Sequence, residues 1–152
     1  MNSFTEFTTL GDLLIKSTAK FGANPAIVFP DQTISYEDLK QRAYQRARAL
    51  VAHDIGPGSH IGILMANCLE YIEYLFAAQL VGAMAVPINA RYKARELAYV
   101  LDNADIELLI THDAISEYAN FGQLIDDALV EGTPEKLNHL VMLGEKRKGF
   151  IW

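Results

Sequence analysis

Residues 61–88 read IGILMANCLEYIEYLFAAQLVGAMAVPI, and this stretch decides the expected fold. The run 61–65 is too short for a helix and apolar on both faces, which is typical of a strand in a covered parallel sheet. The segment 68–80 is apolar nearly all round and predicts a buried helix that ends at Gly82. The run 84–88 predicts a second buried strand. Strand, helix and strand at this interval indicate a right-handed crossover unit.

The same alternation continues on both sides of this unit. Toward the C-terminus the pattern predicts a helix over 94–104, a strand over 108–111, a helix over 121–129 and a strand over 140–143. Toward the N-terminus it predicts a helix from Thr9 to Phe21 and a hairpin around Pro30-Asp31. A second helix follows Ser35, with an apolar stripe of Tyr36, Leu39, Ala43, Ala47 and Leu50. The sequence therefore predicts an α/β fold, mainly a parallel sheet covered by helices, with a short β-hairpin near the N-terminus.

Composition narrows the class of protein. The 152 residues are 51 % hydrophobic and 21 % charged, as expected for one globular domain. A net charge of −6 argues against a nucleic-acid binder. A single cysteine, Cys68, and an N-terminus without a signal-like pattern suit the cytoplasm. The longest uncharged stretch, 74–90, is shorter than the ~20 residues of a membrane span, so no span is expected.

Ligands of parallel sheets bind beyond the carboxyl ends of the strands, here after Met65, Pro87 and Thr111. Near these points we expect Asn67 and Glu70 to cap the buried helix and Cys68 to pack in the core. For His112 we favour an ordinary loop residue over a catalytic one.

Other motifs have plain structural interpretations. Gly56-Pro57-Gly58 precedes a strand, whereas a dinucleotide-binding loop follows one, so a turn is the better interpretation. The four histidines show no i, i+4 pair, and no metal site is predicted from them. Asp126 and Asp127 are expected to be solvated, as is the basic run Lys146-Arg147-Lys148.

Several segments, taken in order, resemble the N-terminal part of the AMP-forming acyl-CoA synthetases, which belong to the adenylate-forming ligases. The resemblance rests on joint order and spacing over roughly residues 9–111, since no single segment is specific. The segments are TLGDLL at 9–14, NPAI at 24–27, ISYEDL at 34–39, RAL at 48–50, GPG at 56–58, IGILMANCLE at 61–70, FAA at 76–78, GAMAVPIN at 82–89, RYK at 91–93 and ELAYVL at 96–101. Ser59 departs from the family, which usually has an acidic residue there.

The resemblance implies a two-step reaction on a small-molecule carboxylic acid, fatty or aromatic. ATP and Mg²⁺ would convert the acid to an acyl-adenylate, and the thiol of coenzyme A (CoA) would capture it. Residues 1–152 would form a partial N-terminal domain that lacks the family's phosphate loop and its C-terminal domain with the catalytic lysine. We therefore expect the chain by itself to be inactive and to bind none of these cofactors tightly; a homodimer stays open.

The resemblance also carries one site residue. Arg91 matches a position that in some of these ligases lies near the nucleotide phosphate of CoA. The alternative for Arg91 is a surface arginine at the start of a helix.

Two other functions remain open. The chain could be a non-catalytic binding or assembly module of the same fold that uses the apolar face 71–80 for a partner. It could also be a small nucleotide-binding domain of an unrelated type.

Overall fold

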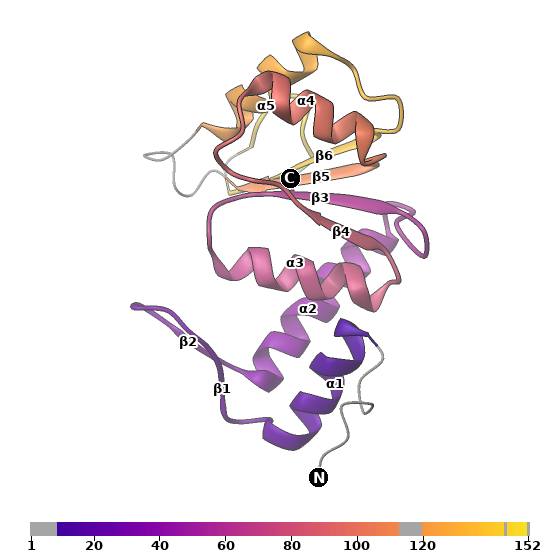
Figure 1. Cartoon of the computed structure of the whole chain (residues 1–152). Coiled ribbons are helices and arrows are strands. Elements are labelled where there is room, and N and C mark those ends of the chain that lie inside the picture. Colours follow the sequence, from indigo (N-terminus) through magenta and orange to yellow (C-terminus); the bar gives the residue numbers. More distant parts are fainter. Residues whose placement is uncertain (1–8, 113–119, 145, 152) are drawn as a thin grey trace.

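The computed structural model follows the predicted alternation of elements (Figure 1). It describes residues 9–112, 120–144 and 146–151. The helices are α1 (Leu10–Phe21), α2 (Tyr36–Val51), α3 (Leu69–Leu80), α4 (Ala94–Asn103) and α5 (Phe121–Glu131). The strands are β1 (Pro25–Val28), β2 (Thr33–Ser35), β3 (His60–Leu64), β4 (Met84–Pro87), β5 (Leu108–His112) and β6 (His139–Leu143).

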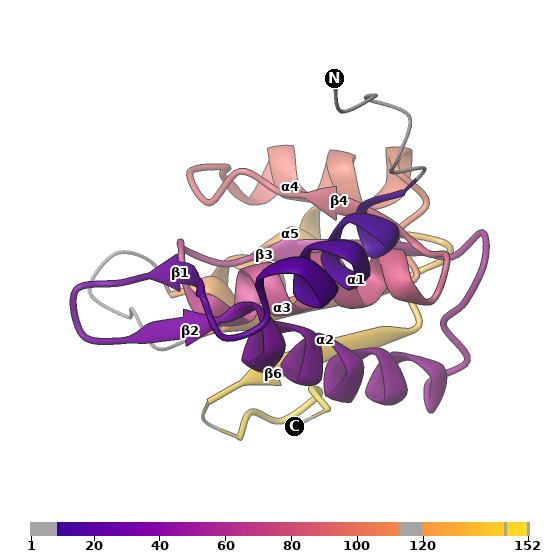
Figure 2. The same cartoon turned by 90° about the horizontal axis from the view of Figure 1, so that it is seen from below.

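The main sheet has four parallel strands in the order β4-β3-β5-β6, as the alternation predicts. Ile61 of β3 lies between Ala85 of β4 and Leu108 of β5, and Leu108 pairs with His139 of β6. Strands β1 and β2 form the predicted antiparallel hairpin separately. In Figure 1, α3 covers one face of the main sheet, and α4 and α5 cover the other. Helices α1 and α2 form a further layer beyond α3, and Figure 2 shows the hairpin projecting beside them.

Short polar side chains cap the starts of α1 and α2. Thr9 Oγ1 accepts a hydrogen bond from the backbone N–H of Asp12 at 3.0 Å, and Ser35 Oγ accepts one from Asp38 at 3.1 Å. Each bond satisfies one of the free N–H groups of the first helical turn. Helices α1 and α2 therefore begin at the capping residues that the sequence predicts. At the end of α3, Gly82 turns the chain with a φ of 77°, a conformation that a side chain would strain.

The two faces of the sheet bury different side chains. On the α3 face the buried cluster includes Ile61, Ile63, Leu108, Ile110, Tyr74 and Ala77. On the α4 and α5 face it includes Leu64, Leu109, Leu97, Leu101, Phe121 and Ile125. Successive strand residues alternate between these clusters because strand side chains point to opposite faces. This accounts for the continuous apolar runs of β3 and β5.

A third buried cluster joins the hairpin to α1, α2 and α3; its members are Leu14, Ile34, Leu39, Ala43 and Leu69. The stripe predicted for α2 is confirmed at Leu39, Ala43, Ala47 and Leu50. The helical spacing of Leu10, Leu13, Leu14, Ser17 and Phe21 predicts that they share one face of α1, and as a buried face this prediction is wrong in part. Leu10 and Phe21 are 43 % and 38 % exposed, while Gly11, Leu14 and Thr18 are buried.

Strand β4 is also less buried than its sequence predicts, because it lies at the edge of the sheet. Met84 is 56 % exposed, and Pro87 lies at the exposed end of the strand. Proline lacks the N–H that a central strand would need, and an edge strand tolerates that loss. Among the described helices, none has the length and apolar character needed to cross a bilayer.

Candidate ligand-binding site at the carboxyl edge of the sheet

The parallel strands bring their carboxyl ends to one edge of the sheet. β3 ends at Leu64, β4 at Pro87 and β5 at His112. The loops that follow β3 and β4 connect to the N-termini of α3 and α4. Open parallel sheets bind ligands at this edge, so these two loops form the candidate site.

The loop after β4 is held by local hydrogen bonds. The Asn89 side chain accepts from the backbone N–H of Arg91 at 3.0 Å, and the Asn89 carbonyl accepts from Tyr92 at 3.1 Å. The Glu96 carboxylate accepts from the backbone N–H of Lys93 at 2.8 Å. Ile88 anchors the start of the loop in the core at 5 % exposure. The loop therefore has a defined backbone from which its side chains project.

That loop and the start of α4 carry three cations, Arg91, Lys93 and Arg95. All three are exposed, and in the described part of the chain none forms an ion pair. The chain as a whole has a charge of −6, so these cations stand out from its overall charge. Unpaired guanidinium and ammonium groups are the natural partners of a phosphate or carboxylate. This edge of the sheet is suited to an anionic ligand.

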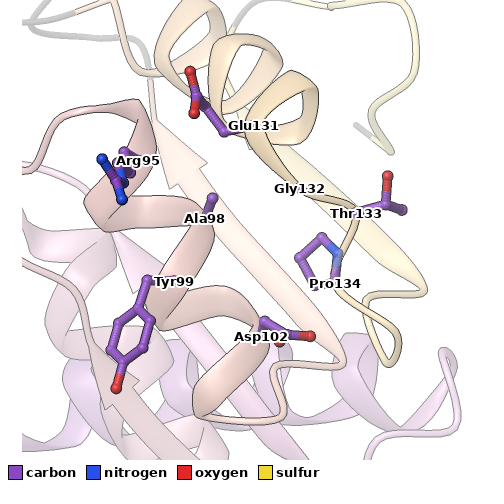
Figure 3. A pocket seen from close by; sticks show the side chains of 8 residues that line it. All are labelled: Arg95, Ala98, Tyr99, Asp102, Glu131, Gly132, Thr133 and Pro134. Atoms are coloured by element: carbon purple, nitrogen blue, oxygen red, sulfur yellow. The ribbon is translucent and has the colours of Figure 1, made fainter.

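Two grooves flank α4 next to these cations. One has a volume of 430 Å³ and is lined by Tyr92, Arg95, Glu96, Tyr99 and Val100. The other, of 470 Å³, lies between α4 and the end of α5 (Figure 3). Its walls are Arg95, Ala98, Tyr99, Asp102, Glu131, Gly132, Thr133 and Pro134. Arg95 and Tyr99 border both grooves, so a cation and an aromatic ring lie together beside the loop.

The loop after β3 differs from its prediction. The N-cap of α3 is Cys68 rather than Asn67, and no side chain caps this helix. Burial raises the pKa of the Cys68 thiol to about 11, and its Sγ lies 3.6 Å from Sδ of Met65. A thiol with a raised pKa is a poor nucleophile, so the predicted packing role fits. Asn67 itself is exposed at the carboxyl edge.

The end of β5 contains an unusual hydroxyl. Thr111 is fully buried, and its Oγ1 has no hydrogen-bond partner within the described residues. His112, singled out from the sequence, follows it as the half-buried last residue of β5. The segment 113–119 that continues from this edge lies outside the described residues.

Glu73 is the important residue that sequence reasoning missed. Its carboxylate is 1 % exposed within α3 and accepts from Nε of Arg46 at 2.8 Å and from Nη1 of Arg42 at 3.2 Å. The three residues fasten α2 to α3. Glu73 lies 27 and 31 positions from its two partners, and this spacing gives no local signal. The only hint is a carboxylate in the middle of a mostly apolar helix.

Two other expectations change in detail. Arg147 is only partly solvated, because its half-buried side chain pairs with Asp126 at the surface and lies over the Phe150 ring at 5.9 Å. Asp127, by contrast, is exposed and accepts from the Gln123 side chain, as a solvated residue can.

The sequence from residue 14 to residue 147 matches the family described as AMP-binding enzyme. The chain belongs to this family. The resemblance identified from the sequence is thereby confirmed, and a nucleotide-binding domain of unrelated type is inconsistent with it.

Relatives of this chain include CoA ligases. An acyl-CoA ligase of Aspergillus fumigatus, sidI, is 35 % identical over 147 residues, which cover 93 % of this chain and 25 % of that protein. The crystal structure of the anthranilate CoA ligase AuaEII with anthranoyl-AMP superposes with a TM-score of 0.79 at 25 % identity, over 93 % of this chain and 26 % of that one. The N-terminal domain of FACL13 from Mycobacterium tuberculosis has a TM-score of 0.77 at 24 % identity, covering 90 % of this chain and 33 % of that domain, which shows the shared fold.

The chain spans about a quarter of the length of the curated ligase it matches. It corresponds to an N-terminal portion of the adenylate-forming ligases.

Proposed function

We propose that the chain is the N-terminal part of an AMP-forming acyl-CoA synthetase. The whole protein activates a carboxylic acid with ATP to an acyl-adenylate, releasing pyrophosphate, and the CoA thiol then displaces AMP to give the thioester. Family membership and the CoA ligases among the relatives support this reaction. The observation in this chain that carries the proposal is the group of unpaired cations Arg91, Lys93 and Arg95 at the carboxyl edge.

Arg91 is proposed to contact a phosphate of CoA. Its backbone N–H is bound by Asn89, so the residue is held at the edge of the sheet while its side chain stays exposed. A guanidinium can donate two parallel hydrogen bonds to phosphate oxygens, which gives orientation as well as affinity. Lys93 and Arg95 add positive charge within the same few residues. Tyr92 and Tyr99, which line the adjoining groove, offer ring surface to a flat group beside the phosphates.

The described residues fit CoA phosphate better than they fit Mg²⁺. Mg²⁺ is held by carboxylate oxygens and substrate phosphates, and the described part of the chain brings together no group of three His, Cys, Asp or Glu. We place the binding of ATP and Mg²⁺ in the whole protein on other segments. The isolated chain is then inactive, since charge stabilisation at the transferred adenylyl group is missing.

A non-catalytic binding module is the second candidate, but the surface proposed for its partner is no longer the face 71–80. The face 71–80 lies mostly inside the protein: Tyr74, Ala77 and Ala78 are buried, and α1 and α2 cover α3. An apolar groove of 460 Å³ lies instead across α1, α2 and the end of α3. Ile15, Tyr44 and Val51 line it and are 42 %, 37 % and 59 % exposed. A partner of the module would contact this groove.

ATP–pyrophosphate exchange and thioester formation separate the two candidates. The measurement compares the 152-residue chain with a protein in which this chain is continued by the phosphate loop and C-terminal domain of a family member. The proposal predicts exchange and thioester formation with the extended protein and neither with the chain alone. Exchange by the chain alone would contradict the placement of ATP binding. A folded extended protein without activity would favour the module.

A further inference from the structure

Two histidines from distant segments face each other away from the carboxyl edge. His53 follows the end of α2, and His139 is the first residue of β6. Their ring centroids lie 5.2 Å apart, with the ring planes inclined at 52°. Both side chains are half-buried, so solvent reaches the pair. Proteins use paired imidazoles of this kind to bind transition metals.

Hydrogen bonds hold the backbone at both histidines. The N–H of His53 donates to the carbonyl of Leu50 at 3.0 Å, continuing the last turn of α2. The N–H of His139 donates to the carbonyl of Glu107 at 3.1 Å, and His139 pairs with Leu108 in the sheet. A site on such rigid elements is preorganised, because little conformational freedom is lost when an ion binds.

The ring nitrogens of the pair are available as ligands. Within the described residues neither imidazole takes part in a hydrogen bond, whereas Nδ1 of His60 lies 2.7 Å from the carbonyl of Ala104. The ring contact alone would be a modest packing interaction. Free nitrogens on two facing rings add the capacity to chelate.

The separation of the rings fits a shared ion. A zinc–nitrogen distance of about 2.0 Å places an ion roughly 3.2 Å from each ring centre, and at a tetrahedral angle two ring centres then lie about 5 Å apart. The observed 5.2 Å agrees with this value.

We propose that His53 and His139 bind one divalent transition-metal ion of the zinc, nickel or copper class. No described group of three His, Cys, Asp or Glu exists, so water completes the coordination. Two imidazoles suit these ions, whereas Mg²⁺ and Ca²⁺ require oxygen ligands. The ion joins the end of α2 to β6, and it stabilises the fold because the unfolded chain lacks the paired site.

Thermal unfolding of the full 152-residue chain, free of any histidine tag and first treated with a chelator, tests this site. With Ni²⁺ or Zn²⁺ at one hundred times the dissociation constant, Tm should rise by about 5–10 °C. Mg²⁺ at the same concentration should leave Tm unchanged. Titration calorimetry should give one Ni²⁺ site per chain.

His53→Ala and His139→Ala should each weaken Ni²⁺ binding at least tenfold, which at the metal concentration used for the native chain reduces the rise in Tm to about half or less. His112 lies in β5 outside the pair, so His112→Ala should keep the native affinity for Ni²⁺ and the native rise in Tm. If an alanine variant unfolds, His53→Gln and His139→Gln replace it, and circular dichroism checks their fold. An unchanged Tm in the native chain, or an equal rise in the native chain and both pair variants, would overturn the proposal.

Discussion

Glu73 Oε2 accepts a hydrogen bond from Nε of Arg46 at 2.8 Å, which joins α3 to α2 through a carboxylate that is 1 % exposed. Arg42 completes the network at 3.2 Å from the other carboxylate oxygen. A buried charge deprived of its partner is costly, although replacing the whole network by apolar residues often is not. The network therefore predicts unequal effects for its members.

Arg46→Ala should lower the free energy of unfolding by about 2 kcal/mol, and Arg42→Ala by about 1 kcal/mol. The side chain of Arg46 is less exposed, 34 % against 47 %, and its bond is shorter. Urea unfolding measures both. Lys40→Ala is the matched control on α2, because its pair with Glu37 is at the surface, where an ion pair contributes little to stability. Equal losses in all three variants would contradict the assigned role of Glu73.

Gly62→Ala should destabilise the protein by about 1–3 kcal/mol, because the centre of β3 has no room for a methyl group. An added Cβ would lie 2.9 Å from Cδ1 of Leu109 and 3.0 Å from Cδ1 of Ile88. Gly56→Ala is the control, since nothing lies within 4 Å of its added Cβ. Denaturant unfolding measures the stability of both variants. If their unfolding curves coincide, the packing around β3 is looser than described.

Thr111→Val should be neutral or stabilise the chain by about 1 kcal/mol, because it removes a buried hydroxyl that has no partner among the described residues. Thr18→Val is the opposite case: its buried hydroxyl donates to the carbonyl of Leu14 at 2.7 Å, and its loss should cost about 1 kcal/mol. Thermal unfolding of both variants gives the comparison. A clear loss of stability in Thr111→Val would mean that the hydroxyl has a partner in solution.

Cys68 should react slowly with thiol reagents. Burial raises its pKa to about 11 from a reference of 9.0, so at pH 8 the thiolate is about a hundredfold scarcer than for an exposed cysteine. The labelling rate of the folded chain should rise about tenfold per pH unit over the range in which the chain stays folded. The urea-unfolded chain provides the control and should react fast. Equal labelling rates for the folded and the unfolded chain would show that the Cys68 thiol is not protected by burial.

Periodic and local features of this fold could be predicted from the sequence. The stripe of α2, its Ser35 cap and the apolar runs of β3 and β5 each depend on neighbours a few positions away. The wrong predictions concern features that are set by the position of an element in the tertiary structure. β4 is as apolar as β3, and only the strand order places it at the edge.

The residues of the candidate site were also predictable only in part. Arg91 came from a resemblance in motif order, and the structure adds what that order could not show: a loop braced by Asn89 and Glu96, with two further cations beside it. The pairing of Glu73 with Arg42 and Arg46, and of His53 with His139, joins residues far apart in the chain. No local pattern in a single sequence encodes such contacts.

The KM for CoA of an Arg91→Ala variant, in the complete ligase, tests the central claim most directly. The proposal predicts an increase of about tenfold, the value of one charge-assisted contact, with an unchanged rate of ATP–pyrophosphate exchange. Arg48→Ala, which removes an exposed arginine of α2 away from the carboxyl edge, should change neither quantity. An unchanged KM for CoA, or a loss of exchange equal to the loss of thioester formation, would contradict the assignment of this edge to CoA.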